Sequence, residues 1–128
     1  MRILLDTCTF LWLITDAPHL SPTARERFAD PQNEVFLSAA SAWEIGLKWQ
    51  RGGLELAQPP TTLVPTQREA HGIVELPIDE ESALHVTRLP PLHRDPFDRV
   101  LVSQAIVHGL VLVTPDPLIT QYPARTLW

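Results

Sequence analysis

Acidic side chains stand where apolar runs of this sequence give way to helix-like stretches. Asp6 follows "ILL", Asp116 follows "LVLVTP", and Asp98 lies within "HRDPFDRVLVSQA", residues 93–105. Glu44 lies in "SAASAWEIGLKW", a segment that would be apolar on nearly every face of a helix. Carboxylate oxygens suit Mg²⁺ or Mn²⁺, and such a metal can activate water. If the four acids converge, we expect metal-assisted hydrolysis of a phosphodiester.

Convergence of four carboxylates carries an electrostatic cost. Two like charges about 4 Å apart repel by roughly 4 kcal/mol at an effective dielectric of about 20. Either some pKa values then rise sharply or a cation lies between the side chains.

Three of these acids also have a purely structural interpretation. Asp6 and Asp116 could each begin a turn, where Asp is common. Glu44 could form an ion pair with Lys48, four residues further along the same helix. Its helix follows an apolar run, so Glu44 could instead point over the edge of the sheet. The sequence leaves both interpretations open.

Asp95 and Asp98 open the same expected helix and should play different parts. Pro96 suits the first helical position, so Asp95 is the expected N-cap. Asp98 is then about the third helical residue, on the same face as Val102 and Ala105. Because that face is expected to be buried, Asp98 should lie at the rim of the core.

Short apolar runs alternate with helical stretches, which is typical of an α/β fold with a parallel sheet. Strands are expected at residues 3–5, 35–37, 73–76, 110–113 and 125–127. Helices are expected at residues 7–15, 22–29, 60–72, 96–108 and 117–121, with one ending at residue 50 and one starting after Asp79. Ligands gather at the carboxyl ends of parallel strands, so Asp6 and Asp116 should share one crevice.

Length and composition indicate one domain, residues 1–128, in a reducing compartment. The chain has an apolar share of 45% and a single cysteine, which cannot form an internal disulfide. Its longest uncharged stretch, residues 100–115, is too short to cross a bilayer, so we expect a cytoplasmic protein. The net charge of −5 argues against an independent DNA-binding module. It does not exclude an enzyme that acts on nucleic acid with a bound cation.

Four motifs, in this order, resemble those of a PIN domain, and more narrowly those of the VapC toxins of bacterial toxin–antitoxin pairs. They are "LLDT", "SAASAWEIGLK", "HRDPFDRVLVSQA" and "LVTPD", and the resemblance covers essentially the whole chain. It implies a three-layer α/β/α sandwich with a central parallel sheet. It also implies a Mg²⁺- or Mn²⁺-dependent endoribonuclease whose catalytic, metal-binding acids match Asp6, Glu44, Asp98 and Asp116.

The resemblance implies further features of the site and its partners. Asp95 matches an extra acid of a "DPFDR" subgroup, and Thr7 and Thr114 fit hydroxyl positions that support the metal site. A homodimer is implied, as is a small antitoxin that occludes the acidic cleft, often with a basic side chain. One departure is Cys8-Thr9, where the subgroup often has His-Ala. Cys8 is expected to pack in the first helix and not to act as a nucleophile.

Other candidates have competing interpretations. His93, Arg94 and Arg99 could contact RNA phosphate. His93 could equally be a loop histidine bonded to backbone, and the arginines could pair with acids such as Asp95. Three tryptophans are interpreted as core or dimer contacts and not as platforms for RNA bases: Trp12, Trp43 and Trp49.

Rival functions share the same acidic edge. An aspartyl-nucleophile phosphatase would need a second Asp two residues after Asp6, where this chain has Cys8. A phospho-receiver domain would need a Lys after a late strand, whereas the only lysine is Lys48. The remaining alternative is a catalytically inactive PIN-like module that binds a partner. The sequence does not indicate which RNA would be cut or whether one or two metals would act.

Overall fold

The computed structural model describes residues 1–128 and contains one sheet of five parallel strands. The strand order is β3-β2-β1-β4-β5, with β1 in the centre. The strands are β1 (Arg2–Leu5), β2 (Glu34–Ser38), β3 (Val74–Leu76), β4 (Val111–Val113) and β5 (Thr126–Leu127). The parallel sheet that the alternating pattern predicted is therefore confirmed.

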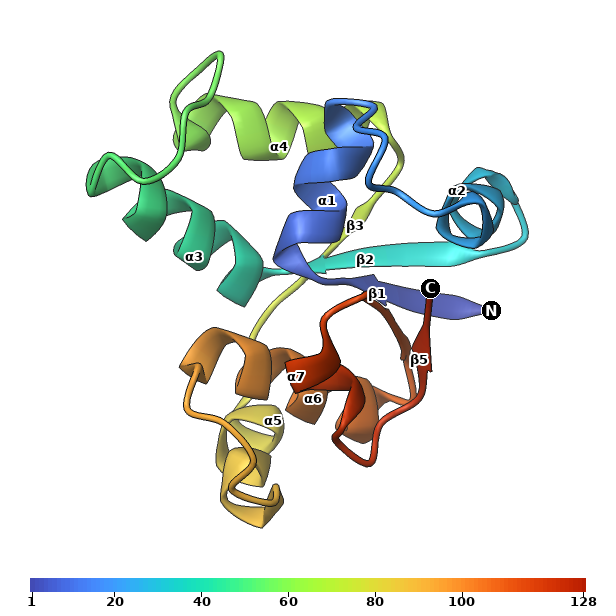
Figure 1. Cartoon of the computed structure of the whole chain (residues 1–128), viewed down its shortest axis with the longest axis vertical. Helices are drawn as coiled ribbons and strands as arrows, with labels where there is room; N and C mark the ends of the chain where they lie inside the picture. The colour runs from blue at the N-terminus through green and yellow to red at the C-terminus, as the bar shows by residue number, and fades with distance from the viewer.

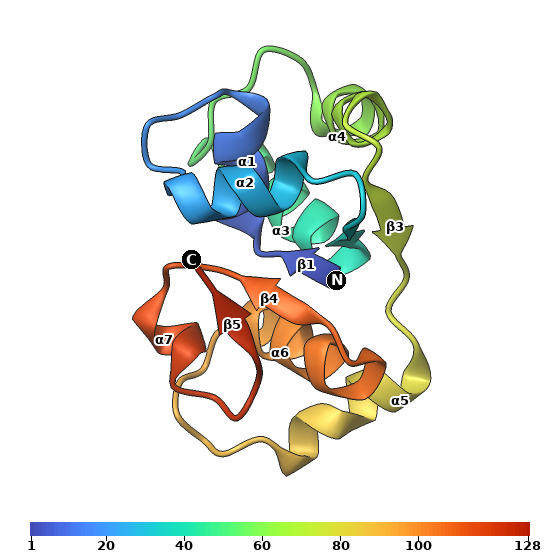
Figure 2. The same cartoon turned by 90° about the vertical axis from the view of Figure 1, so that its right-hand side faces the viewer.

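Helices cover both faces of this sheet, which gives the expected three-layer sandwich (Figures 1 and 2). The layer on one face consists of α1 (Thr7–Ile14), α2 (Pro22–Ala29), α3 (Ala39–Gln50) and α4 (Pro60–Ala70). The layer on the other consists of α5 (Glu80–His85), α6 (Pro96–His108) and α7 (Pro117–Thr120), with a 3₁₀ turn at Val86–Arg88. No helix of the chain has the length and apolarity needed to cross a bilayer.

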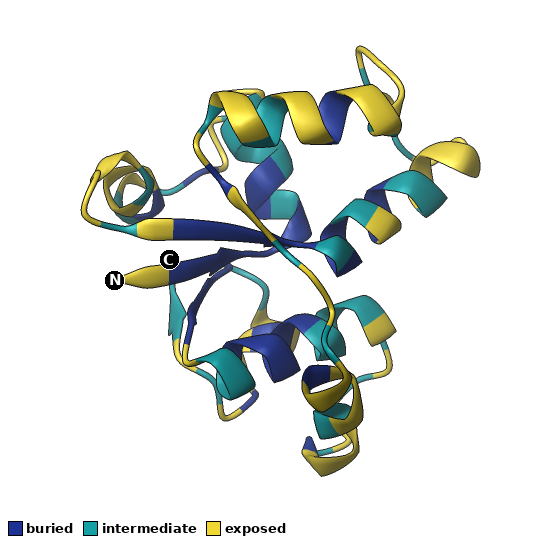
Figure 3. Cartoon of the chain, turned by 180° about the vertical axis from the view of Figure 1, so that it is seen from behind, coloured by how far each residue is buried: buried dark blue, intermediate teal, exposed yellow.

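The two layers have separate cores because side chains alternate between the faces of a strand. Ile3 and Leu5 of β1 pack into the core beneath α1 and α2, together with Phe10 and Ile45. Leu4, between them, packs into the opposite core beneath α6. Figure 3 shows the buried strands between the two helical layers. The central strands β1, β2 and β4 are thus buried on both faces, as strands of parallel sheets usually are, whereas the edge strand β3 is largely exposed.

Local capping explains where several helices begin and end. Ser21, Ser38 and Asp79 each accept a hydrogen bond from a backbone N–H in the first turn of α2, α3 and α5. The sequence offers Ser38 or Ser41 as the cap of α3, and the structure shows that the cap is Ser38. Helix α6 ends at Gly109, whose φ of 66° is the left-handed conformation that a glycine adopts without strain.

Small differences from the expected boundaries have local causes. Helix α4 continues through Pro65 but ends at Ala70, and the backbone turns at Gly72 with a φ of 65°. The sequence predicts a rigid connector at "RLPPLHR", residues 88–94, and its first residue lies inside the 3₁₀ turn that follows α5. Neither difference displaces a candidate site residue.

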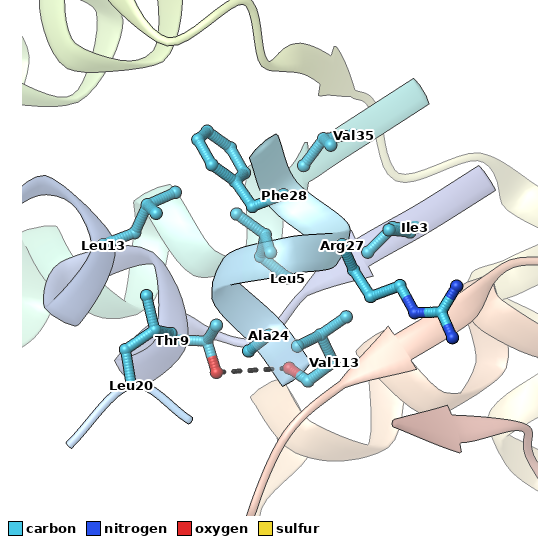
Figure 4. A pocket seen from close by; sticks show the side chains of 10 residues that line it. All are labelled: Ile3, Leu5, Thr9, Leu13, Leu20, Ala24, Arg27, Phe28, Val35 and Val113. Atoms are coloured by element: carbon cyan, nitrogen blue, oxygen red, sulfur yellow. Dashed lines mark hydrogen bonds between the residues drawn. The ribbon is translucent and has the colours of Figure 1, made fainter. Parts of the chain in front are cut away.

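An apolar hollow lies between α2 and the sheet (Figure 4). Its free volume of about 10 Å³ is at the lower limit for one water molecule. The hydroxyl of Thr9 donates to the carbonyl of Val113 at 3.2 Å, so this hydroxyl at the wall already has a partner. We interpret it as a packing defect of the first core.

Candidate active site

A cleft of about 320 Å³ opens beside the carboxyl ends of β1 and β4. Within the sheet, β2 is the neighbour of β1 on one side and β4 is its neighbour on the other, so the strand order reverses at β1. Crevices at such a change of direction are where ligands bind in open α/β sheets. One lysine, Lys48, and five acids line this cleft: Asp6, Glu44, Asp95, Asp98 and Asp116.

Asp6 is held rigidly at the floor of the cleft. It is 3% exposed and caps α1, accepting a hydrogen bond from the backbone N–H of Thr9 at 2.8 Å. The hydroxyl of Thr114 donates to its other oxygen, and this bond joins the ends of β1 and β4. The carboxylate therefore has a fixed orientation before any ligand binds.

Glu44 is buried in the wall that α3 contributes. Its Oε2 forms an ion pair with Lys48 Nζ at 2.7 Å, so the predicted pairing within the helix is present. The hydrogen bond that Lys48 donates to Glu44 raises the pKa of Lys48. Its Oε1 is buried and has no hydrogen-bond partner, although an unpaired buried carboxylate oxygen is costly. One carboxylate oxygen of Glu44 is thus paired with Lys48, and the other has no partner.

Asp95 and Asp98 divide their roles as their positions in the helix predict. Asp95 caps α6 and accepts hydrogen bonds from the backbone N–H groups of Phe97 and Asp98 at 2.9 and 3.2 Å. Asp98 has a side chain only 16% exposed. Burial raises the pKa of Asp98 to about 6; contact with His93 opposes this rise, while the charges of Asp95 and Glu44 add to it.

Asp116 and the two threonines complete the walls. Asp116 caps α7 through the backbone N–H of Leu118 at 2.9 Å, and its own N–H donates to Thr114 at 3.1 Å. Thr7 donates to the hydroxyl of Ser41 at 3.0 Å, which ties α1 to α3. Thr114 thus contacts two of the acidic residues, whereas Thr7 supports the helices that carry Asp6 and Glu44.

Cys8 also lines the cleft, with its sulfur 3.4 Å from an oxygen of Asp6. Burial, followed by the negative charge of Asp6, raises the pKa of the Cys8 thiol to about 12. A thiol in this environment carries almost no thiolate at neutral pH, so it is a poor nucleophile, as the sequence predicted.

The structure separates the three basic candidates. Arg94 is exposed. His93 is nearly enclosed, with ring nitrogens 3.0 Å from an oxygen of Asp98 and 2.7 Å from the hydroxyl of Tyr122. Arg99 donates to that same hydroxyl and to the carbonyl of Pro90. His93 and Arg99 are therefore occupied within the protein, and Arg94 has the freest side chain of the three.

The tryptophans are less buried than the core interpretation requires. Trp43 and Trp49 on α3 are 60% and 41% exposed, so the core part of that interpretation is wrong for both. Trp43 and Phe97 form an edge-to-face pair with ring centres 5.0 Å apart. Each ring directly precedes an acid of the cleft, Glu44 and Asp98 respectively. Trp12 packs against Trp128 on the first core.

The donor set of the cleft fits a hard divalent cation. Oxygen is the donor of every acid, one buried oxygen of Glu44 lacks a partner, and Lys48 is the only cation among the lining residues. No three acidic, histidine or cysteine side chains lie close enough together to form a ready-made metal site. The acids share one cleft without forming the compact cluster that four mutually contacting carboxylates would make.

Sequence comparison assigns the fold to a family. The sequence model of the PIN domain matches residues 3–124. The chain belongs to the PIN domain family. It is 30% identical, over 87 residues, to ribonuclease VapC16 of Mycobacterium tuberculosis. That match covers 62% of this chain and 62% of the relative, so more than a third of the relative's length lies outside it.

Solved structures share the fold of this PIN domain at low sequence identity. The VapBC2 complex from Rickettsia felis, bound to a promoter DNA fragment, aligns over 100% of this chain and 99% of its own, with a TM-score of 0.75 and 15% identity. VapBC-1 of nontypeable Haemophilus influenzae aligns over 99% and 97%, with a TM-score of 0.65 and 19% identity. VapC20 of Mycobacterium tuberculosis, described as a sarcin–ricin loop cleaving toxin, covers 93% of each chain, with a TM-score of 0.66 and 14% identity.

Two residues of the site region make contacts that no sequence motif reveals. Tyr122 lies in the loop after α7, 24 residues from Asp98, yet its hydroxyl reaches His93. The position of Ser41 in the sequence indicates at most a helix cap, but its hydroxyl accepts from Thr7. Both contacts depend on the packing of distant segments, which local spacing does not encode.

Proposed function

We propose that this PIN domain is a Mg²⁺- or Mn²⁺-dependent endoribonuclease that hydrolyses RNA phosphodiester bonds. The observation that supports this most is the cleft, in which five carboxylates and a single lysine face one space. A cleft of that charge would repel polyanionic RNA unless a cation lay between them. The name of the relative in Mycobacterium tuberculosis, a ribonuclease, agrees with this activity.

Asp6, Glu44, Asp98 and Asp116 are the residues that would hold the cation. When bound, such an ion lowers the pKa of a water ligand and neutralises charge on the phosphate. The chain's own contribution is positional. Thr114 orients Asp6, and α3 carries Glu44, which pairs with Lys48, into the wall of the cleft. Lys48 offsets part of the negative charge.

We further propose that the protein is the toxin of a toxin–antitoxin pair and acts as a homodimer in the cytoplasm. The VapBC complexes of similar fold support this assignment. An antitoxin that reached the cleft with a basic side chain would place a cation among the same carboxylates. The narrower "DPFDR" subgroup, based on residues 95–99, stays a prediction.

A second candidate is a catalytically inactive PIN domain that binds a protein partner through the same cleft. One observation favours it, because no three potential ligands form a ready-made metal site. The ion pair between Glu44 and Lys48 also occupies one of the cleft's oxygens. The two candidates predict opposite results with RNA.

The test compares cleavage of a mixed RNA pool by the wild type, Asp98→Asn and Asp95→Asn, each freed of antitoxin. We expect the wild type to cut with Mg²⁺ or Mn²⁺ and EDTA to stop it. Asp98→Asn should lose activity by a factor on the order of 10² or more, because a metal-binding carboxylate is gone. Asp95→Asn should keep cutting, since Asn caps a helix about as well as Asp.

Each contrary result has a definite meaning. A wild type that cuts no RNA with either metal would favour the partner-binding candidate. Loss of cleavage in Asp95→Asn with activity retained in Asp98→Asn would reverse the roles assigned to the two aspartates.

A further inference from the structure

A chain of hydrogen bonds runs from Arg99 through Tyr122 and His93 to Asp98. The guanidinium of Arg99 lies 2.9 Å from the hydroxyl of Tyr122, and His93 lies between that hydroxyl and the carboxylate. All of these groups are enclosed: Tyr122 is 3% exposed, and the side chains of His93 and Asp98 are 9% and 16% exposed. This chain of hydrogen bonds ends at Asp98, which lines the cleft.

The direction of this chain follows from the number of donors. Arg99 can only donate to Tyr122, and the backbone N–H of His93 also donates to it, at 3.3 Å. With its oxygen accepting twice, the tyrosine has its own hydrogen left to donate to Nδ1 of His93. A neutral histidine that accepts at Nδ1 carries its proton on Nε2. That proton points at Oδ2 of Asp98, 3.0 Å away.

Arg99 is anchored by further hydrogen bonds, so it can hold the hydroxyl of Tyr122 in place. Its guanidinium also donates to the carbonyls of Pro90 and Val86, at 3.0 and 3.1 Å. These carbonyls belong to the connector and to the 3₁₀ turn before α6. The arginine is therefore a fixed donor whose position does not depend on solvent.

We propose that His93 is a positioning residue that fixes the carboxylate of Asp98 for cation binding. The hydrogen bond from His93 occupies Oδ2 of Asp98. Oδ1 of Asp98 accepts no hydrogen bond from any protein group and stays available to the cleft. Tyr122 and Arg99 act through His93 by holding its ring and its tautomer. This inference rests on the proposed metal-dependent function, and it replaces a direct contact of His93 with RNA. Partners of this kind typically change metal affinity or activity by 10- to 100-fold.

The test uses the full chain with three variants and one control. His93→Leu removes the donor, and His93→Gln keeps an amide N–H near the position of Nε2. Tyr122→Phe keeps the ring but removes the hydroxyl. His85→Gln is the control, because the ring of His85 makes no hydrogen bond and lies outside the cleft. Circular dichroism confirms that each variant is folded.

Three measurements are made on each protein. Titration calorimetry measures Mn²⁺ affinity, steady-state cleavage of a model RNA measures kcat and KM, and ¹⁵N NMR at pH 8 reports the His93 tautomer. We expect His93→Leu to lose about 10- to 100-fold in Mn²⁺ affinity and kcat, with KM for RNA little changed. His93→Gln should recover most of that loss. The wild-type ring should carry its proton on Nε2, and Tyr122→Phe should give a mixture of tautomers.

The results separate this inference from the function on which it rests. If the wild type cuts RNA and His93→Leu binds Mn²⁺ and cuts equally well, the positioning role is wrong and the proposed function stands. A wild-type proton on Nδ1 of His93 would also overturn it. If the wild type neither binds Mn²⁺ nor cuts RNA, the proposed function and the inference are overturned together.

Discussion

Asp98 is a carboxylate that the fold keeps at an energetic cost. Burial, with nearby negative charge, raises its pKa to about 6, so its ionised form is less favourable in the folded chain than in the unfolded one. The ionised carboxylate lowers the free energy of unfolding at pH 8, and this loss disappears below about pH 4, where both states are protonated.

Asp98→Asn should therefore stabilise the metal-free protein. The amide has no charge to desolvate and can accept the same hydrogen bond from His93. We expect the free energy of unfolding to rise by about 1 kcal/mol at pH 8 in EDTA. Urea unfolding followed by circular dichroism measures it, with the exposed Asp30→Asn as control. If Asp98→Asn were less stable than the wild type, the ionised carboxylate of Asp98 would not destabilise the fold.

At the same scale, the sequence predicted the local roles and missed the distant ones. Asp95 could be assigned as a cap because Pro96 follows it, and structure and prediction agree. The pairing of Glu44 with Lys48 could be predicted from their spacing alone. The contact of His93 with Tyr122 could not, because 29 residues separate them and no periodicity links them.

At the scale of elements, most helices and strands were predictable because their ends carry local signals. Ser21, Asp79 and Gly109 mark ends that the structure reproduces. The order of the strands was not predictable in the same way. Pairing of β1 with both β2 and β4 joins segments some 30 and 110 residues apart, and only the family resemblance implied how they would assemble.

One contact between elements should make stability depend on acid pH. Asp79 caps α5 and lies 2.7 Å from the ring of His108 at the end of α6. The hydrogen bond from His108, and then that from Ser82, hold the pKa of Asp79 well below its usual range. A lowered pKa stabilises the fold at pH values above about 4, and this contribution is lost as the pH falls below that value.

Asp79→Asn should therefore lower stability at pH 6 and matter less as the pH approaches 2. Asn caps helices about as well as Asp, so the capping bond is kept while the charged contact with His108 is lost. Urea midpoints measured from pH 2.5 to 7 test this, with Glu80→Gln in the same helical turn as control. A difference from the wild type that stays constant across this range would contradict the assignment. The effect should be modest, because the carboxyl is partly exposed.

At the scale of the whole molecule, the cleft lies along the seam between the two helical layers. Asp6 and Glu44 belong to the side of the sheet covered by α1 and α3, whereas Asp98 and Asp116 are carried by α6 and α7. The layers have separate hydrophobic cores, joined through the strands between them (Figure 1). A cation bound by acids from both sides would cross-link the layers next to the point where Trp43 of α3 already contacts Phe97 of α6.

Binding of Mn²⁺ should therefore raise the melting temperature of the whole domain. A ligand at 100 times its Kd stabilises the folded state by about 2.7 kcal/mol, which corresponds to a rise on the order of 5–10 °C for a domain of this size. The measurement is thermal unfolding by circular dichroism at pH 8, with NaCl of equal ionic strength as control.

Glu44→Gln should reduce the rise because it removes a ligand from one layer, whereas the exposed Glu34→Gln should leave it unchanged. If excess Mn²⁺ left the wild-type transition where NaCl leaves it, the acids would not act together as a metal site. The charge of the cleft would then be better explained by a basic partner protein, which should raise the melting temperature in place of the metal.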